Sequence, residues 1–133
     1  MDFTVIRDII PINSLDASYL LDDHTGYIKL NKFSATTTSE FNDAIKALKA
    51  GSKLNSLVLD LRGNGGGYLT AAIELADQFL NDSKLVVYTS GLHSEKKEYS
   101  ASALGELEQG KLILLIDEGS ASASEIVSGA IQD

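Results

Sequence analysis

The sequence lacks cysteine and tryptophan, has a single proline, and is short of positive charge. Without cysteine it forms neither disulfide bonds nor thiolate metal sites, which fits a reducing cytosol or an exported protein that does without disulfides. Eleven Lys and Arg against 19 Asp and Glu give a net charge of −8, which repels phosphate, so we expect no nucleic-acid partner. The apolar run 112–116 is far shorter than the roughly 18 residues of a membrane span, so we expect no membrane insertion of this segment.

The 133 residues, 44% of them hydrophobic, suffice for one domain with a core, or for part of one. The first residues show no cationic and apolar segment of the kind that directs export. Residues 124–133 have the apolar spacing of a helix and reach Asp133 without a capping or breaking residue. We therefore expect the sequence to be part of a longer protein, with its targeting segment outside these residues.

Hydrophobic periodicity and turn residues divide the chain into strands and helices. Two short β-rich runs come first, at 3–6 and 9–12. The pattern then predicts a hairpin around the turn 22–26, a helix from a capping box at 37–40 to Gly51, a buried strand at 57–61, a helix at 68–80, strands at 85–89 and 96–100, a buried strand at 112–116 and a final helix. This order argues for an α/β fold in which two buried strands lead into helices.

The first candidate site is a glycine-rich loop, Gly63-Asn64-Gly65-Gly66-Gly67, between the buried strand that ends Asp60-Leu61-Arg62 and a helix. Glycine permits positive φ and a close approach of the main chain to a ligand, and free N–H groups at a helix start face an anion. Three interpretations compete: a phosphate cradle, an oxyanion hole and a plain tight turn. The phosphate cradle is disfavoured, because Tyr68 stands where the dinucleotide motif has glycine and no Lys-Ser or Lys-Thr follows.

The second candidate is the segment Gly119-Ser120-Ala121-Ser122-Ala123-Ser124-Glu125, again between a predicted buried strand and a helix. Taken alone, it is a helix N-terminus with a capping box from Ser122 to Glu125. Both loops are expected at the carboxyl ends of buried strands, where α/β folds gather their ligand sites. Their combination in one short chain favours a chemical function over two simple turns.

Together these two stretches resemble the signature motifs of the carboxyl-terminal processing, or tail-specific, serine peptidases. The likeness covers residues 26–133, and the pair of motifs is far more specific than either motif alone. It implies a crotonase/ClpP-like β-β-α superhelix core, of which residues 13–133 are the N-terminal portion and which is incomplete here. Residues 1–12 would be the tail of a preceding PDZ-like domain or a linker. The likeness implies neither a cofactor nor a metal.

The resemblance also assigns roles. Ser122 would be the nucleophile, and the backbone N–H groups of Gly67 and Ala123 would form the oxyanion hole, one donor of which is worth about 2.7–4 kcal/mol of barrier in a known peptidase. Glu125 matches a position that supports the catalytic lysine in some members, although it also suits the capping box. The family's general-base lysine lies downstream of the serine motif, beyond Asp133. We therefore expect the longer protein to cleave proteins near exposed carboxyl-terminal tails by a Ser/Lys mechanism, and this chain to be inactive.

The residues also bear on other general bases and on other functions. His24 and His93 are unattractive as bases because the Gly-x-Ser-x-Gly elbow of Ser–His enzymes is absent. A non-catalytic peptide-binding or scaffold module, in which Ser122 only caps a helix, and a crotonase-type acyl-CoA enzyme stay open as alternatives. A truncated core would leave apolar strands bare and favour self-association. The resemblance further implies a place in the periplasm or cell envelope.

Overall fold

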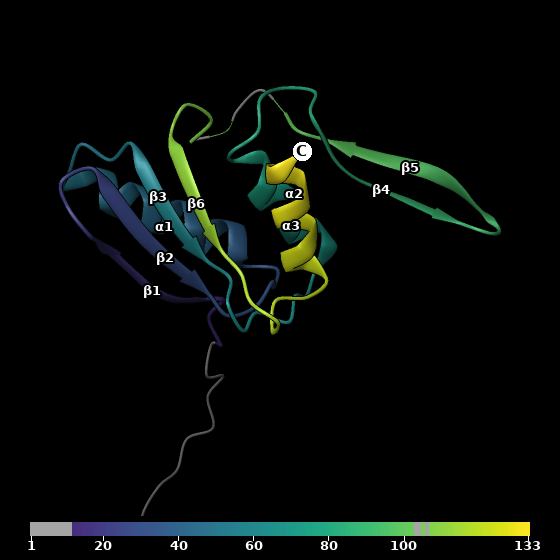
Figure 1. Ribbon diagram of the computed structural model, residues 1–133, viewed down its shortest axis with the longest axis horizontal. Coiled ribbons are helices and arrows are strands. Elements are labelled where there is room, and N and C mark those ends of the chain that lie inside the picture. The colour runs from purple at the N-terminus through teal and green to yellow at the C-terminus, as the bar shows by residue number, and fades with distance from the viewer. Residues whose placement is uncertain (1–11, 103–104, 106) are drawn as a thin grey trace, which may run out of the picture.

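A four-stranded sheet, three helices and a separate β-hairpin make up the computed structural model, which describes residues 12–102, 105 and 107–133. In Figure 1, α1 lies behind the sheet, α2 and α3 lie next to each other beside it, and the hairpin extends away from them. The elements are β1 (Leu15–Leu20), β2 (Thr25–Leu30), α1 (Thr37–Ala50), β3 (Ser56–Asp60), α2 (Leu69–Asp77), β4 (Leu85–Gly91), β5 (Ser94–Ser100), β6 (Lys111–Leu115) and α3 (Ala123–Gln132). The order of strands and helices is the one that the sequence pattern predicts, and the fold is mixed α/β.

The sheet has the order β1-β2-β3-β6. Strands β1 and β2 form the predicted antiparallel hairpin, whereas β2, β3 and β6 are parallel to one another. Strand β3 is an inner strand, as its nearly unbroken apolar sequence predicts. Because parallel strands end at the same edge of a sheet, the loops that follow β3 and β6 lie beside each other.

The core lies between the sheet and the helices. Alternate residues of β2 and β3 point into it, as expected for strands with one face covered. Helix α1 adds apolar side chains at helical spacing, and α2 and α3 add small and branched ones. Its most deeply buried members are Ile28, Leu30, Phe41, Ile45, Leu57, Leu59, Leu75 and Val127.

Three local predictions were wrong. Strand β6 is not buried on both faces: Ile113 is 57% exposed, and among the described residues β6 is the last strand of the sheet. The capping box at 37–40 does not form: Thr36 precedes the helix, and the carboxylate of Glu40 instead accepts the backbone N–H groups of Ser14 and Leu15. The second helix ends at Asp77, three residues early. The two runs predicted at 3–6 and 9–12, and the PDZ-like tail, lie outside the described residues apart from Ile12.

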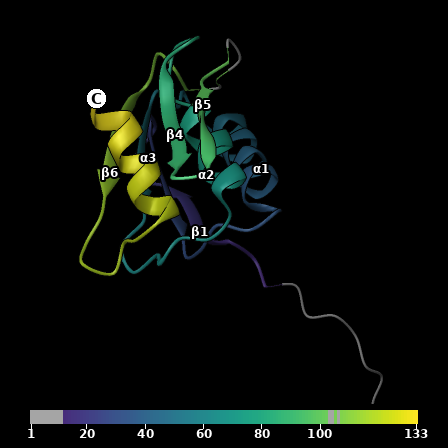
Figure 2. The same ribbon diagram turned by 90° about the vertical axis from the view of Figure 1, so that its right-hand side faces the viewer.

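Strands β4 and β5 form their own two-stranded sheet. Figure 2, turned by 90°, shows this hairpin in front of α2, with α3 at its side. Val86 anchors the hairpin in a small second core with Ala76, Ala101 and Ala130. Strand β5, in contrast, is exposed along nearly its whole length. No helix among the described residues has the length and apolar character needed to cross a bilayer.

Candidate active site

The glycine-rich loop and the serine turn meet at the carboxyl edge of the parallel sheet. Residues 61–67 follow β3, and residues 116–122 follow β6. A Cβ atom on Gly66 would lie 2.8 Å from the Cβ of Ser122 and 2.9 Å from the backbone nitrogen of Ala123. The absence of a side chain at Gly66 therefore allows the two loops to touch beside Ser122.

The glycine loop has a backbone that other residues adopt with difficulty. Gly63, Gly66 and Gly67 have φ values of 71°, 97° and 145°. Gly67 also packs directly on the main chain of Phe33, where an added Cβ would overlap the carbonyl oxygen. Hydrogen bonds from Phe33 N–H to Gly66 O (2.9 Å) and from Tyr68 N–H to Phe33 O (3.0 Å) fix this part of the loop against the segment that follows β2.

The serine turn places Ser122 in an unusual conformation, with φ 53° and ψ −111°, immediately before α3. A positive φ is rare for a residue with a side chain and is frequent at functional sites. The strand-to-helix turn with a strained, exposed serine is the arrangement that the Gly-x-Ser-x-Gly motif gives to other hydrolases. Here the turn forms without those flanking glycines, because the space comes from Gly66 of the other loop.

Asn64 joins the two loops. Its side chain is fully buried, donates to Leu30 O at 2.9 Å and accepts the N–H of Gly66 at 2.9 Å. The backbone carbonyl oxygen of Asn64 accepts the backbone N–H of Ala121 at 3.1 Å and the hydroxyl of Ser124 at 2.8 Å. One residue thus holds the end of β2, the glycine loop and the serine turn in register.

A second link between the loops runs through Asp117 and Ser120. Asp117 Oδ1 accepts the N–H groups of Gly63 (2.8 Å) and Gly119 (3.0 Å), and Ser120 Oγ donates to Leu61 O at 2.8 Å. The bond from Gly63, followed by the other donors around Asp117, holds the pKa of this carboxyl group below its usual value. The carboxylate therefore stays charged and keeps both loops together.

These bonds leave particular N–H groups unused. Within the described part of the chain, the N–H groups of Gly67 and Ala123 donate to no protein acceptor, whereas those of Gly66, Ala121 and Ser122 all do. Ala123 is the first residue of α3, so its N–H lies at the positive end of the helix. The two residues predicted as oxyanion donors thus stand in the two loops that meet beside Ser122.

Glu125 contacts the main chain of the candidate nucleophile. Its Oε2 accepts the backbone N–H of Ser122 at 2.7 Å, and the two residues form the predicted capping box. Such an interaction stabilises the start of α3 and holds the Ser122 backbone.

A charge cluster around the buried carboxylate of Asp60 lies at the start of the glycine loop. Asp60 is fully buried, accepts two hydrogen bonds from the Arg62 guanidinium (2.7 and 3.0 Å) and one from the Tyr27 hydroxyl (2.6 Å). The Arg62 hydrogen bonds hold the pKa of Asp60 far below its usual value, against the opposing effect of burial. The hydrogen bond from the Tyr27 hydroxyl to Asp60 raises the pKa of Tyr27. The cluster fixes the direction in which the chain leaves β3.

The structure shows no contact between either histidine and this site. His24 precedes β2, at the opposite edge of the sheet, and its Nδ1 is 3.2 Å from Lys53 O. His93 lies at the tip of the β4–β5 hairpin. No group of three or more His, Asp or Glu side chains in residues 12–102, 105 and 107–133 is arranged to hold a metal ion.

Sequence reasoning gave no role to Asn64, Asp117 or Asp60, although two of them belong to the quoted motifs. The sequence context of Asn64 could have indicated its role, because it is a polar residue between glycines directly after a buried strand. A buried amide must form hydrogen bonds with other groups. The partners of Asp117 come from the other loop and leave no mark in the local sequence.

Comparisons with known proteins agree on one family. The family model "Peptidase family S41" matches residues 24–133. A "Carboxy-terminal-processing protease" of Bartonella bacilliformis is 39% identical over 137 residues, which cover 100% of this chain and 31% of the relative. A "Probable CtpA-like serine protease" of Staphylococcus aureus is 39% identical over 134 residues and covers 99% of this chain and 26% of the relative.

The solved structures include the "Photosystem II D1 C-terminal processing protease". It superposes with a TM-score of 0.77 at 27% identity, over 92% of this chain and 34% of that one. The fold of this chain is therefore similar to part of a processing protease. The chain belongs to peptidase family S41, the family of the carboxyl-terminal processing proteases, and it spans about a third or less of the length of these relatives. These named proteases do not favour the alternatives of a scaffold module or an acyl-CoA enzyme.

Proposed function

We propose that the protein to which this chain belongs is a serine endopeptidase that cleaves protein substrates near exposed carboxyl-terminal tails. One observation supports the proposal: the glycine loop and the serine turn are bonded through Asn64 and touch at Gly66 and Ser122, and each of these two loops carries one unused N–H group, that of Gly67 and that of Ala123. Ser122 is the nucleophile, and the two N–H groups stabilise the oxyanion that develops when Ser122 Oγ adds to the peptide carbonyl.

We propose a lysine as the general base, supplied by the protein beyond Asp133. Two lysines of this chain bind groups other than Ser122: Lys29 binds Arg62 O and Asp60, and Lys96 binds Glu98. A serine hydroxyl without a base within hydrogen-bonding reach is a weak nucleophile. This chain alone is therefore proposed to be inactive.

We consider two possible roles for Glu125. In the first, its carboxylate helps the catalytic lysine by charge. In the second, it holds the Ser122 backbone through the 2.7 Å bond to the Ser122 N–H. The short bond supports the second version, in which Glu125 is a positioning residue.

The wider features of the family enter as part of the same proposal. The core is of the crotonase/ClpP-like type, follows a PDZ-like domain and works in the periplasm or cell envelope. Self-association of this chain is proposed because Ile113 and Ile116, on and beside the edge strand β6, are 57% and 53% exposed. Sedimentation that gives a monomer at all concentrations up to the millimolar range would contradict self-association alone.

The activity is tested with three proteins: this chain, a chain extended past Asp133 by the residues that follow in the natural protein, and the extended chain with Ser122→Ala. A peptide with an apolar carboxyl-terminal tail is the substrate. The extended chain is expected to cleave it, and the other two are expected to be silent. Equal turnover with and without Ser122 would refute the peptidase function, and turnover by this chain alone would refute the requirement for a downstream base.

A further inference from the structure

The N–H group of Gly67 has no protein acceptor among the described residues, yet another hydrogen bond sets its direction. The peptide group between Gly66 and Gly67 is trans and planar, so its C=O and N–H point in opposite directions. Gly66 O accepts the N–H of Phe33 at 2.9 Å. The Gly67 N–H therefore points away from Phe33, and a rotation of this peptide group would break the bond to Phe33.

Local backbone preference does not hold this peptide group in place. Gly66 and Gly67 have φ values of 97° and 145°, and glycine lacks the Cβ atom that restricts rotation in other residues. The contact with Phe33 is what selects one orientation of the Gly67 N–H. An oxyanion donor that already has its working orientation needs no reorganisation during the reaction. The efficiency of this donor therefore depends on how firmly the main chain of Phe33 is held.

Phe33 is held by Thr37, the first residue of α1. Thr37 Oγ1 accepts the N–H of Ser34 at 2.8 Å, and Ser34 O accepts the N–H of Thr37 at 3.2 Å. The Ser34 N–H belongs to the same peptide group as Phe33 O, which accepts the N–H of Tyr68 at 3.0 Å. The Thr37 hydroxyl thus fixes the peptide group between Phe33 and Ser34, against which the glycine loop lies.

The Thr37 side chain is fully buried, and both functions of its hydroxyl are used. Besides accepting the Ser34 N–H, the hydroxyl donates to Ser14 Oγ at 2.7 Å, and Ser14 is equally buried. A β-branched side chain with these partners is restricted to one rotamer. Because Thr37 has no exposed surface, it can act on a reaction at Ser122 only through the main chain that it holds.

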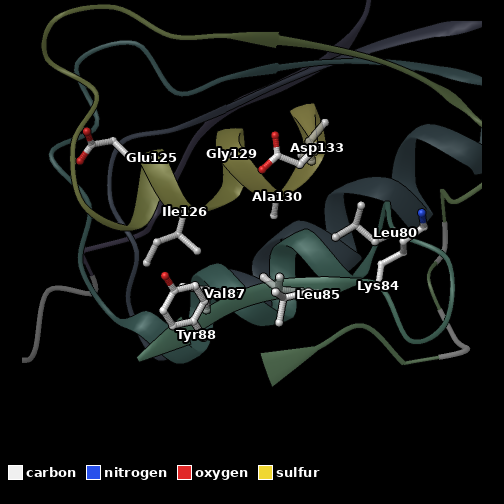
Figure 3. A pocket seen from close by; sticks show the side chains of 12 residues that line it. Leu80, Lys84, Leu85, Val87, Tyr88, Glu125, Ile126, Gly129, Ala130 and Asp133 are labelled. Carbon is white, nitrogen blue, oxygen red and sulfur yellow. The ribbon is translucent and has the colours of Figure 1, made fainter. Parts of the chain in front are cut away.

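The second donor, the N–H of Ala123, is fixed in a different way. The carbonyl oxygen of Ser122 accepts the N–H of Ile126 at 3.0 Å, a bond of the first turn of α3. Figure 3 shows Glu125 and Ile126 of this turn beside a groove of about 550 Å³ between α3 and β4, and no described residue of α1 lines the groove. The direction of the Ala123 N–H is therefore set by its own helix and does not depend on Thr37.

We propose that Thr37, which lies in neither catalytic loop, is a positioning residue for the oxyanion hole: its hydroxyl holds Phe33, and Phe33 orients the Gly67 N–H. The catalytic consequence rests on the peptidase function, whereas the orientation of the N–H does not. Loss of the hydroxyl removes no contact with the substrate. It should therefore slow the chemical step and leave substrate binding unchanged.

The orientation is tested on this chain with residual dipolar couplings, which report the direction of each backbone N–H. Thr37→Val removes the hydroxyl and keeps the size of the side chain, whereas Thr37→Ser keeps the hydroxyl. We expect the Gly67 coupling to shift beyond the scatter of the other couplings in Thr37→Val and to stay unchanged in Thr37→Ser. The Ala123 coupling should be unchanged in both variants. An unchanged Gly67 coupling in Thr37→Val, or an equal shift at Ala123, would overturn the proposal.

The catalytic consequence is tested in the chain extended past Asp133, with the peptide substrate described above. Removal of a whole oxyanion donor lowers kcat about 100–1,000-fold in a known peptidase, so we expect misdirection of the Gly67 donor in Thr37→Val to lower kcat at least about tenfold. The KM should stay within about twofold of wild type. Thr37→Ser should restore kcat to within about threefold. Equal kcat values for the two variants would overturn the proposal.

Ile45→Val is the matched control, because it removes one methyl group from a fully buried side chain of the same helix and leaves the Thr37 hydroxyl in place. Urea denaturation should show that it weakens the fold. Its kcat should nevertheless stay within about twofold of wild type. A loss of kcat equal to that of Thr37→Val would mean that Thr37 acts only through the stability of α1, which overturns the proposal. If Thr37→Val does not fold, Thr37→Ala takes its place with the same expected results.

The two proposals fail in different ways. An extended wild-type chain without activity would refute the peptidase function, while a shifted Gly67 coupling in Thr37→Val would still support the positioning role. Full activity of the extended Thr37→Val chain would overturn the positioning role and leave the peptidase function intact.

Discussion

The glycine loop and the serine turn reach the same place by opposite means. Each follows a parallel strand and precedes a helix. The glycine loop owes its course to missing side chains, with positive φ at Gly63, Gly66 and Gly67 and no room for a Cβ at the last two. The serine turn has one positive φ, at Ser122, and is held by side-chain hydrogen bonds of Ser120, Ser124 and Glu125.

The difference determines how each loop should respond to mutation. A backbone conformation that requires glycine is strongly destabilised when a Cβ atom is added, because the close-packed surroundings cannot relieve the steric overlap. A turn held by several neutral hydrogen bonds loses them one at a time, and each contributes about 0.5–1.5 kcal/mol to stability. The glycine loop should therefore be the intolerant half of the site and the serine turn the tolerant half.

The largest effect is expected from Gly67→Ala. The added Cβ would overlap Phe33 O and lie 2.8 Å from Phe33 C, at a φ of 145°. We expect the free energy of unfolding to fall by about 3 kcal/mol or more, as for other severe steric lesions. Urea denaturation measures it. Gly65→Ala is the control, since nothing lies within 4 Å of that Cβ, and it should change stability by less than about 1 kcal/mol, in the stabilising direction. A well-folded Gly67→Ala would break the comparison.

Asp60→Asn should have the next largest effect, because it removes a fully buried carboxylate from the Arg62 guanidinium. The folded-state pKa of Asp60 is depressed, mainly by its bonds to Arg62, so its contribution is fully present above the unfolded pKa of about 3.9 and is lost as the pH falls toward the folded value. The stability difference between wild type and variant should therefore narrow steadily below about pH 4. Urea titrations at pH 7, 4 and 2.5 measure it, and a constant difference would contradict the assigned role.

Ser124→Ala tests the serine turn. Its buried hydroxyl donates to Asn64 O at 2.8 Å, and that oxygen keeps a second donor, the N–H of Ala121. We expect a loss of about 1 kcal/mol, the usual net contribution of a neutral hydrogen bond. A loss as large as that of Gly67→Ala would mean that the two loops are equally intolerant.

The smallest effect should come from Glu125. Glu125→Ala removes the acceptor of the Ser122 N–H and should reduce stability by about 0.5–1 kcal/mol, as for other capping interactions. Glu125→Gln keeps an acceptor oxygen and should stay within a few tenths of a kcal/mol of wild type. In the extended chain, Gln at 125 should also preserve most of the activity. Glutamine that behaves like alanine in kcat would favour the charge-based role instead.

How far the sequence predicts the structure depends on where a residue's partners lie. The strand 57–61, the first helix and the order of all the elements follow from local periodicity. The capping box from Ser122 to Glu125 was predicted because its partners are three residues apart. Glu40 showed the same local spacing but binds Ser14 and Leu15, which are 26 and 25 residues away, and local patterns do not reveal such partners.

Strand β6 shows the same limit at the level of the sheet. The run 112–116, most of which forms β6, is as apolar as a central strand, yet the place of β6 at the edge of the described sheet depends on what else pairs with it. In the candidate site, the sequence motifs predict the two loops and Ser122. The links through Asn64 and Asp117 were not, because they exist only once β3 and β6 are parallel neighbours.

The central claim is that Gly67 and Ala123 donate to one oxygen beside Ser122. A crystal structure of the extended, active chain with a peptidyl boronic acid tests it most directly, because a boronate bonded to serine mimics the tetrahedral intermediate. We predict boron bonded to Ser122 Oγ, with one boronate oxygen about 2.7–3.1 Å from both backbone nitrogens. An oxygen that faces solvent, or that is held by donors from other residues, would contradict the account.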